Sequence, residues 1–180
     1  DESAPIKCIT VEAIQAALKK CHFFTQFGKK NTIISDGTFD LGEDLQATCD
    51  LFYPFLEECL RYVKTQTESE WARGDTNNGL LTINRGMQAL IRVINDIVDM
   101  LVEQKIIFPK TMPTGEVFNE VRYYLDPLID YLNSITPEQR KDLRGFFGGG
   151  ADARFWRAFQ KAIADVRSDF NTEKLREYWL

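Results

Sequence analysis

A lone histidine beside a cysteine is the first place in this sequence where catalysis could be sought. His22 follows Cys21 directly. Neighbouring residues on a helix point about 100° apart, so this thiol and imidazole cannot form a nucleophile and base pair by themselves. We therefore expect His22 to be structural. A single histidine also excludes a helical di-iron site, which needs Glu-x-x-His pairs on two helices.

The cysteines show neither metal-binding nor redox spacing. No Cys-x-x-Cys pair and no histidine-rich segment is present to complete a zinc site. We expect the cysteines to be buried free thiols in a reducing compartment. No metal and no cofactor is predicted. The cysteines are Cys8, Cys21, Cys49 and Cys59.

Two pairs of aspartates lie at helical spacing, Asp96 with Asp99 and Asp126 with Asp130. Such pairs share a helix face and could bind a hard cation or share a proton. Asp96, however, follows Arg92 by four residues, which is an ordinary ion-pair spacing. We interpret the polar stripe around it as a solvated face, or as a face that docks on another part of the protein. The stripe comprises Arg85, Gln88, Arg92, Asn95, Asp96, Asp99 and Glu103.

The segment RGFFGGGADARFWRAFQK, residues 144–161, runs from three glycines into a strongly patterned helix. Glycines before a helix can let backbone N–H groups converge on an anion at the positive end of the helix dipole. The segment lacks the Gly-Lys-Ser/Thr of a Walker A loop. A cap and hinge between two helices is the favoured interpretation, and contact with an anion or a DNA backbone is the alternative. The candidate contact residues are Gly148, Gly149, Gly150, Arg144, Arg154, Arg157 and Lys161.

The charge balance limits the classes of partner. Lys plus Arg number 22 against 27 Asp plus Glu, a net charge of −5. The overall field therefore repels nucleic acid and anionic membrane, and a polyanion could bind only at a local patch. No apolar run reaches the ~20 residues of a membrane span, and the N-terminus lacks a signal peptide pattern. We expect no membrane partner and a location in a reducing cytoplasm.

The pattern of apolar residues predicts an all-α fold. They recur every three or four positions in runs at 45–63, 83–101, 117–135 and 155–170. Shorter helices are expected at 11–21 and 137–145. This predicts a compact bundle of about six to eight helices in a single domain, residues 1–180. The aromatic and apolar end of the chain suggests a C-terminal fragment of a larger protein.

Local signals refine the helix ends. Thr136 to Gln139 form a capping box with proline at the first helical position. Thr114 and Asn171 are expected to cap their helices. Pro54 and Pro127 fall inside apolar runs and predict a kink or a break. A small hairpin could form in the loop at 28–42.

Three strings, taken together, resemble a known family. They are GLLTINRGMQALIRVINDIVDML (79–101), YLDPLIDYL (124–132) and GGGADARFWRAFQKAI (148–163), followed by DFN and YW. In this order they resemble the C-terminal helical region of bacterial DGQHR-domain proteins, relatives of DndB from DNA phosphorothioation clusters. The likeness spans residues from about 21 to 179, and none of its motifs is a catalytic signature.

The resemblance implies an accessory domain of a DNA-modification or defence protein. The Asp-Gly-Gln-His-Arg motif of such proteins lies in an N-terminal ParB-like half that this chain does not contain, so no active-site residue can be transferred. Three hypotheses follow. The first is a non-enzymatic helical module that packs on the DGQHR half of its own protein or on another subunit. The second is a DNA-contacting regulatory domain, and the third is part of an enzyme completed by that half. The oligomeric state stays open.

Overall fold

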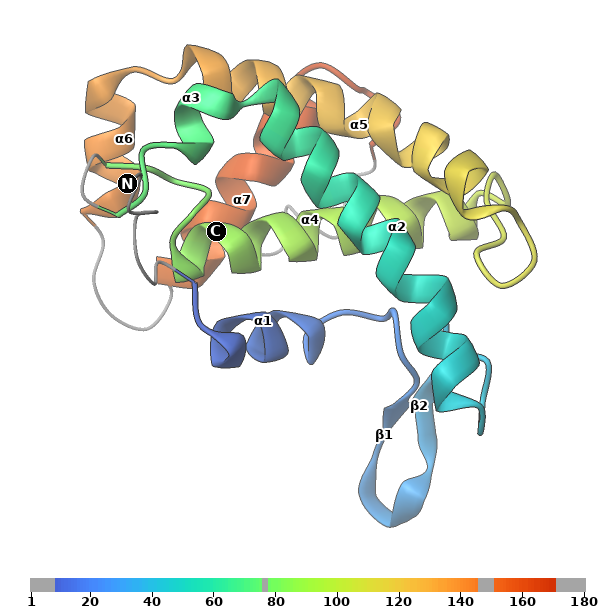
Figure 1. Ribbon diagram of the computed structural model, residues 1–180. Helices are drawn as coiled ribbons and strands as arrows, with labels where there is room; N and C mark the ends of the chain where they lie inside the picture. Colours follow the sequence, from blue (N-terminus) through green and yellow to red (C-terminus); the bar gives the residue numbers. More distant parts are fainter. Residues whose placement is uncertain (1–8, 76–77, 146–150, 171–180) are drawn as a thin grey trace, which may run out of the picture.

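The computed structural model describes residues 9–75, 78–145 and 151–170. Within these ranges the chain forms seven α-helices and one small antiparallel hairpin, so the expected all-α bundle is confirmed (Figure 1). The elements are α1 Val11–Leu18, β1 Gln26–Phe27, β2 Ile33–Ser35, α2 Leu45–Gln66, α3 Glu68–Trp71, α4 Asn84–Glu103, α5 Thr114–Ser134, α6 Pro137–Arg144 and α7 Ala151–Ala164.

Helix α4 is the centre of the core. It contacts α1, α5 and α7, while α2 packs mainly on α5 (Figure 1). Its residues Leu90, Ile94 and Leu101 are completely or almost completely buried. Because helices cover α4 on several sides, even the polar Asn95 on this helix is buried. The widened apolar run at 83–101 therefore marks a central helix, as expected.

The helix ends agree with the local signals in most places. The Thr136 side chain accepts a hydrogen bond from the backbone N–H of Gln139, and the Gln139 side chain accepts one from the N–H of Thr136, so the capping box is confirmed. The expectation that Thr114 caps α5 is wrong. Thr114 is already helical, because the carbonyl of Pro113 accepts the first helical hydrogen bonds, from Glu116 and Val117. Asn171 lies outside the described residues.

Both prolines are accommodated without breaking their helices. α2 continues through Pro54, and α5 continues through Pro127. Pro127 has no N–H to donate to the carbonyl of Tyr123, four residues earlier. The guanidinium Nε of Arg167 donates to that carbonyl instead, at 3.2 Å. Of the kink or break predicted at Pro54 and Pro127, the break occurs at neither position.

Helix α7 is shorter than its apolar run. The helix ends at Ala164, and Val166 is 60% exposed. Phe170 is nevertheless buried, because a turn returns the chain to α5, where its ring lies 6.2 Å from that of Tyr124. Helical spacing at 155–170 thus combines a true helix with a turn that buries one further aromatic ring.

The hairpin between β1 and β2 extends away from the helices (Figure 1). Its turn places Lys30 and Asn31 at positive φ, 62° and 55°. Two successive positive φ values fit a turn with the right-handed twist that hairpins favour. The hairpin considered for the loop at 28–42 is therefore present, although its first strand begins before that loop.

A buried ion pair joins α3 to α6. Glu70 is 2% exposed and its carboxylate pairs with the guanidinium of Arg140, whose side chain is 8% exposed. The same carboxylate accepts the backbone N–H groups of Leu80 and, at 3.3 Å, Leu81. Arg140 also donates to the carbonyl of Asn78 at 3.4 Å. One buried carboxylate therefore connects α3, α6 and the segment that leads into α4.

Candidate functional site

The polar stripe of α4 meets α7 at Asp96. The indole N–H of Trp156 donates to Oδ2 of Asp96 at 2.6 Å, and the side-chain amide of Gln160 donates to the same oxygen at 2.8 Å. The guanidinium of Arg92 lies 3.8 Å from the centre of the Trp156 ring, in a cation–π contact. This part of the stripe therefore binds α7 of the same chain.

Asp96 is the carboxyl group whose acidity is most affected by this packing. Burial, with a smaller contribution from the neighbouring Asp99, raises the pKa of Asp96 to about 6. The hydrogen bonds from Trp156 and Gln160, which favour the charged carboxylate, only partly oppose burial. The contact between α4 and α7 is thus sensitive to pH, since Asp96 changes charge near pH 6.

We expect Asp96→Asn to change how stability depends on pH. The unfolded chain releases the Asp96 proton near pH 4, whereas the folded chain keeps it to about pH 6. The contribution of Asp96 to stability is therefore fully present below about pH 4 and is lost as the pH rises through about 6. Asparagine can still accept from Trp156 and Gln160 but cannot ionise. The stability of Asp96→Asn relative to wild type should thus rise by roughly 2 kcal/mol from pH 4 to pH 7.

Urea unfolding at several pH values measures this difference directly. Asp130→Asn serves as the control, because Asp130 is exposed on α5. If the free energies of unfolding of wild type and Asp96→Asn differ by the same amount at every pH from 4 to 7, the assigned pKa of Asp96 is wrong.

The other part of the stripe holds the segment after α1. Oδ1 of Asn95 accepts the backbone N–H of His22 at 2.7 Å, and its amide donates to Asp99 at 2.8 Å. Nδ1 of His22 lies 2.7 Å from Oδ2 of Asp99. The polar network therefore fixes the segment at 21–22 against α4.

Cys21 and His22 do not form a catalytic pair. The Cys21 side chain is buried, and burial raises the pKa of its thiol, which disfavours the thiolate. Its Sγ donates to the carbonyl of Ala17 at 3.2 Å, while His22 pairs with Asp99. The buried free thiols expected at Cys21 and Cys59 are confirmed.

The expectation for Cys49 is wrong. It is a free, exposed cysteine, because the buried face of α2 runs through Thr48, Phe52 and Phe55 and not through Leu45 and Cys49. Cys8 lies outside the described residues.

Carboxylates do not gather into a cation site in the part of the chain that the structure describes, where no cluster of three or more possible metal ligands occurs. Asp126 accepts a hydrogen bond from the hydroxyl of Tyr62 at 2.6 Å. Burial and this hydrogen bond raise the pKa of Tyr62 to about 12. Asp126 therefore connects α5 to α2, and its neighbour Asp130 is exposed.

The predicted docking face is thus largely used within the chain. Asn95 and Asp96 contact residues of the chain itself, which corrects the picture of a face that only solvent or a partner covers. Arg85 and Gln88 are half-buried, and Glu103 is exposed. Asp99 contacts His22 and Asn95, and docking of a partner on the stripe stays a prediction.

The candidate basic patch also forms contacts within the chain. Arg144 donates to the carbonyl of Gly79 at 2.7 Å and pairs with Asp75 at 2.8 Å. Lys161 pairs with Asp165 on the next turn at 2.6 Å. These contacts leave less positive charge than the sequence suggests, because Arg144 and Lys161 each have a carboxylate partner. Gly148, Gly149 and Gly150 lie outside the described residues.

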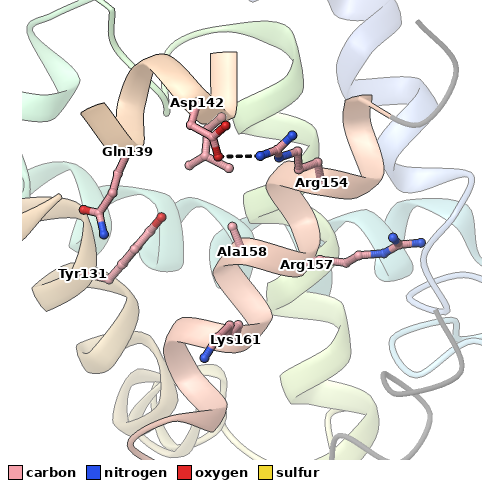
Figure 2. Close-up of a pocket in the computed structure, with 8 residues that line it drawn as sticks. Tyr131, Gln139, Asp142, Arg154, Arg157, Ala158 and Lys161 are labelled. Atoms are coloured by element: carbon pink, nitrogen blue, oxygen red, sulfur yellow. Dashed lines mark hydrogen bonds and ion pairs between the residues drawn. The ribbon is translucent and has the colours of Figure 1, made fainter. Parts of the chain in front are cut away.

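Arg154, Arg157 and Lys161 line one pocket of about 390 Å³ beside α6 and α7. Figure 2 shows Arg154 turned toward Asp142, with which it forms an ion pair. The guanidinium of Arg157 points away from Tyr131 and Gln139 in the same view, and its Nε is buried without a hydrogen-bond partner among the described residues. The pocket thus brings together three predicted contact residues but also contains a carboxylate.

Two residues on α7 have polar roles that the sequence alone did not predict. The indole N–H of Trp156 and the side-chain amide of Gln160 both donate to Asp96. The two residues are four positions apart and so share one face of α7. A polar residue four positions after a tryptophan, on an apolar face, was the available signal.

The chain matches no family model, no curated protein and no solved structure among those compared with it. Among the described residues, no helix is both long enough and apolar enough to cross a membrane.

Proposed function

We propose that this chain is a non-enzymatic helical interaction module, the accessory domain of a DGQHR-type protein in a bacterial DNA-modification or defence system. Its partner would be the N-terminal DGQHR half of its own protein or another subunit in the cytoplasm. The observation that carries the proposal is the use of polar groups. Asp96, Asn95 and Arg140 join helices to one another, which is the chemistry of a scaffold.

The resemblance supplies the context of the proposal. The strings at 79–101, 124–132 and 148–163 correspond to α4, to part of α5 and to α7 with the glycines before it. These elements contact one another in the core. The family likeness therefore concerns a packing arrangement rather than a reactive site.

The coding sequence upstream of Asp1 tests this context. We expect it to encode an Asp-Gly-Gln-His-Arg motif in the same reading frame, next to genes of DNA modification or defence. An unrelated domain upstream would overturn the assignment to this family and would leave the helical interaction module to be tested by binding.

Contact with DNA is the second candidate function, because Arg154, Arg157 and Lys161 line a common pocket. We expect the double change Arg154→Ala, Arg157→Ala to leave retention on duplex DNA unchanged at about 0.1 M salt, since Asp142 and Asp165 offset the positive charge nearby. Filter binding at several salt concentrations measures the effect, with Lys105→Ala as the control. Loss of a salt-sensitive retention in the double variant alone would favour the DNA-contacting domain.

A further inference from the structure

A groove between α1 and α2 is lined mainly by apolar side chains and is used by no function described above. Its volume is about 360 Å³. We call it the α1–α2 groove. It is lined by Ile9, Ile14, Tyr53, Leu56, Glu57, Leu60, Arg61, Lys64, Trp71 and Met87.

The groove exists because its two walls pack on different helices. α1 packs on α4, whereas α2 packs mainly on α5 (Figure 1). Met87 of α4 also lines the groove. Large apolar side chains at its edges stay accessible to solvent. Tyr53 is 67% exposed and Ile14 is 36% exposed. An apolar surface of this kind on a folded chain is typical of an interaction site.

The walls of the groove favour a helix as the occupant. Both walls are α-helices, whose backbone groups are already hydrogen-bonded within the helix, so an extended peptide would find no main-chain partner. A helix satisfies its own backbone and needs only side-chain contacts. Tyr53, Leu56 and Leu60 follow one another at steps of three and four residues, the spacing of a ridge that fits the side chains of a second helix.

The charges beside the groove select the type of helix. Arg61 and Lys64 stand on α2 at its edge, and Arg61 forms an exposed ion pair with Glu57 at 2.6 Å. An exposed ion pair of this kind contributes little to stability, so Arg61 can pair with a carboxylate of the occupant instead of Glu57. One negative and two positive side chains leave this edge positive, although the chain as a whole carries −5. Acidic side chains on the occupant would therefore be attracted here.

We propose that the α1–α2 groove binds an amphipathic helix of a partner polypeptide, with apolar residues on one face and acidic residues along the edge next to Lys64. This inference rests on the proposed function and specifies the surface through which the module would act. A bound helix would cover Tyr53 and Ile14 and would contact Trp71 at the end of α3.

A designed peptide tests the groove directly. The probe is a fluorescently labelled helical peptide with leucines at positions i, i+3, i+4 and i+7 and glutamates along one edge. We expect saturable binding to the 180-residue chain by fluorescence anisotropy. Tyr53→Ser should weaken it about tenfold, as loss of an anchoring aromatic side chain does. Val166→Ser, which changes an equally exposed apolar residue outside the groove, should leave it unchanged.

A charge exchange tests the orientation of the helix. A second peptide carries lysines in place of the glutamates and should bind the wild-type chain several-fold more weakly. Lys64→Glu should reverse this preference, while Lys105→Glu, an exposed change outside the groove, should not. Both variants alter exposed side chains, so folding is not at risk.

Several outcomes would overturn the proposal. These are absence of saturable binding, equal weakening by Tyr53→Ser and Val166→Ser, equal affinity for the two peptides, or occupation of the groove by a small apolar dye but by neither peptide. The proposed function is tested independently of the groove. If the chain associates with the DGQHR half of its protein and Tyr53→Ser has no effect on that association, the groove assignment is wrong and the interaction module stands.

Discussion

Arg140→Ala is expected to destabilise the fold by about 3–5 kcal/mol, because it removes the buried cationic partner of the Glu70 carboxylate. Only Arg73 remains as a cationic neighbour, and its Nε lies 3.8 Å from the carboxylate on a side chain that is 43% exposed. The backbone N–H groups of Leu80 and Leu81 remain as donors but do not balance the charge. α3 should then loosen from α6, and Trp71 at the end of the α1–α2 groove with it. Urea unfolding of wild type and Arg140→Ala measures the change in the free energy of unfolding.

Two further variants test whether loss of the buried ion pair causes the destabilisation by Arg140→Ala. Arg61→Ala breaks the exposed pair with Glu57 and should change stability by less than about 1 kcal/mol. Glu70→Gln in the Arg140→Ala background removes the unpaired charge but keeps an acceptor for Leu80 and Leu81, so it should recover part of the loss. A loss below about 1 kcal/mol for Arg140→Ala would contradict the account of this ion pair.

Gly86→Ala is expected to destabilise the chain by about 4 kcal/mol. A methyl group on Gly86 would overlap the carbonyl oxygen of Leu80 and would lie 2.6 Å from its carbonyl carbon and 3.1 Å from Cα of Leu81. The neighbours are backbone atoms of a buried segment, so they cannot move aside as a flexible side chain could. α4 must separate from this segment, and Met87 in the α1–α2 groove should move as well.

Gly115→Ala is the matched control for this prediction. Gly115 lies in the first turn of α5, and a methyl group there would meet no atom within 4 Å. Alanine is the better helix former, so this change should stabilise the chain by up to about 1 kcal/mol. Thermal unfolding of both variants makes the comparison, and similar effects of the two changes would exclude close packing at Gly86 as the cause.

The sequence predicts the helices well because each depends on neighbours three or four residues apart. The runs at 45–63 and 83–101 correspond to α2 and α4, and the capping box of α6 is local by definition. Pro127 is a position where the neighbouring residues do not predict the structure. Its helix continues, and Arg167, which follows α7, donates to the carbonyl of Tyr123 that the proline leaves without its helical donor. No residue close to Pro127 in the sequence predicts this hydrogen bond.

The site was less predictable because a helix face shows its polarity but not what covers it. In the sequence, Asp96 and Asn95 belong to a polar stripe that predicts contact with solvent or a partner. In the structure, they accept hydrogen bonds from Trp156 and His22 of the same chain. Glu70 and Arg140 are 70 residues apart, and neither has a neighbour that predicts burial as a pair. Long-range polar pairs of this kind depend on how the helices pack.

Association with the DGQHR partner that we propose tests the central claim most directly. The 180-residue chain and that DGQHR half would be produced as separate chains, mixed and followed by isothermal titration calorimetry and sedimentation. An interaction module should form a saturable one-to-one complex with a dissociation constant on the order of 1 μM, with no added metal or nucleic acid. Absence of heat and of any complex at about a hundred times that concentration would contradict the account.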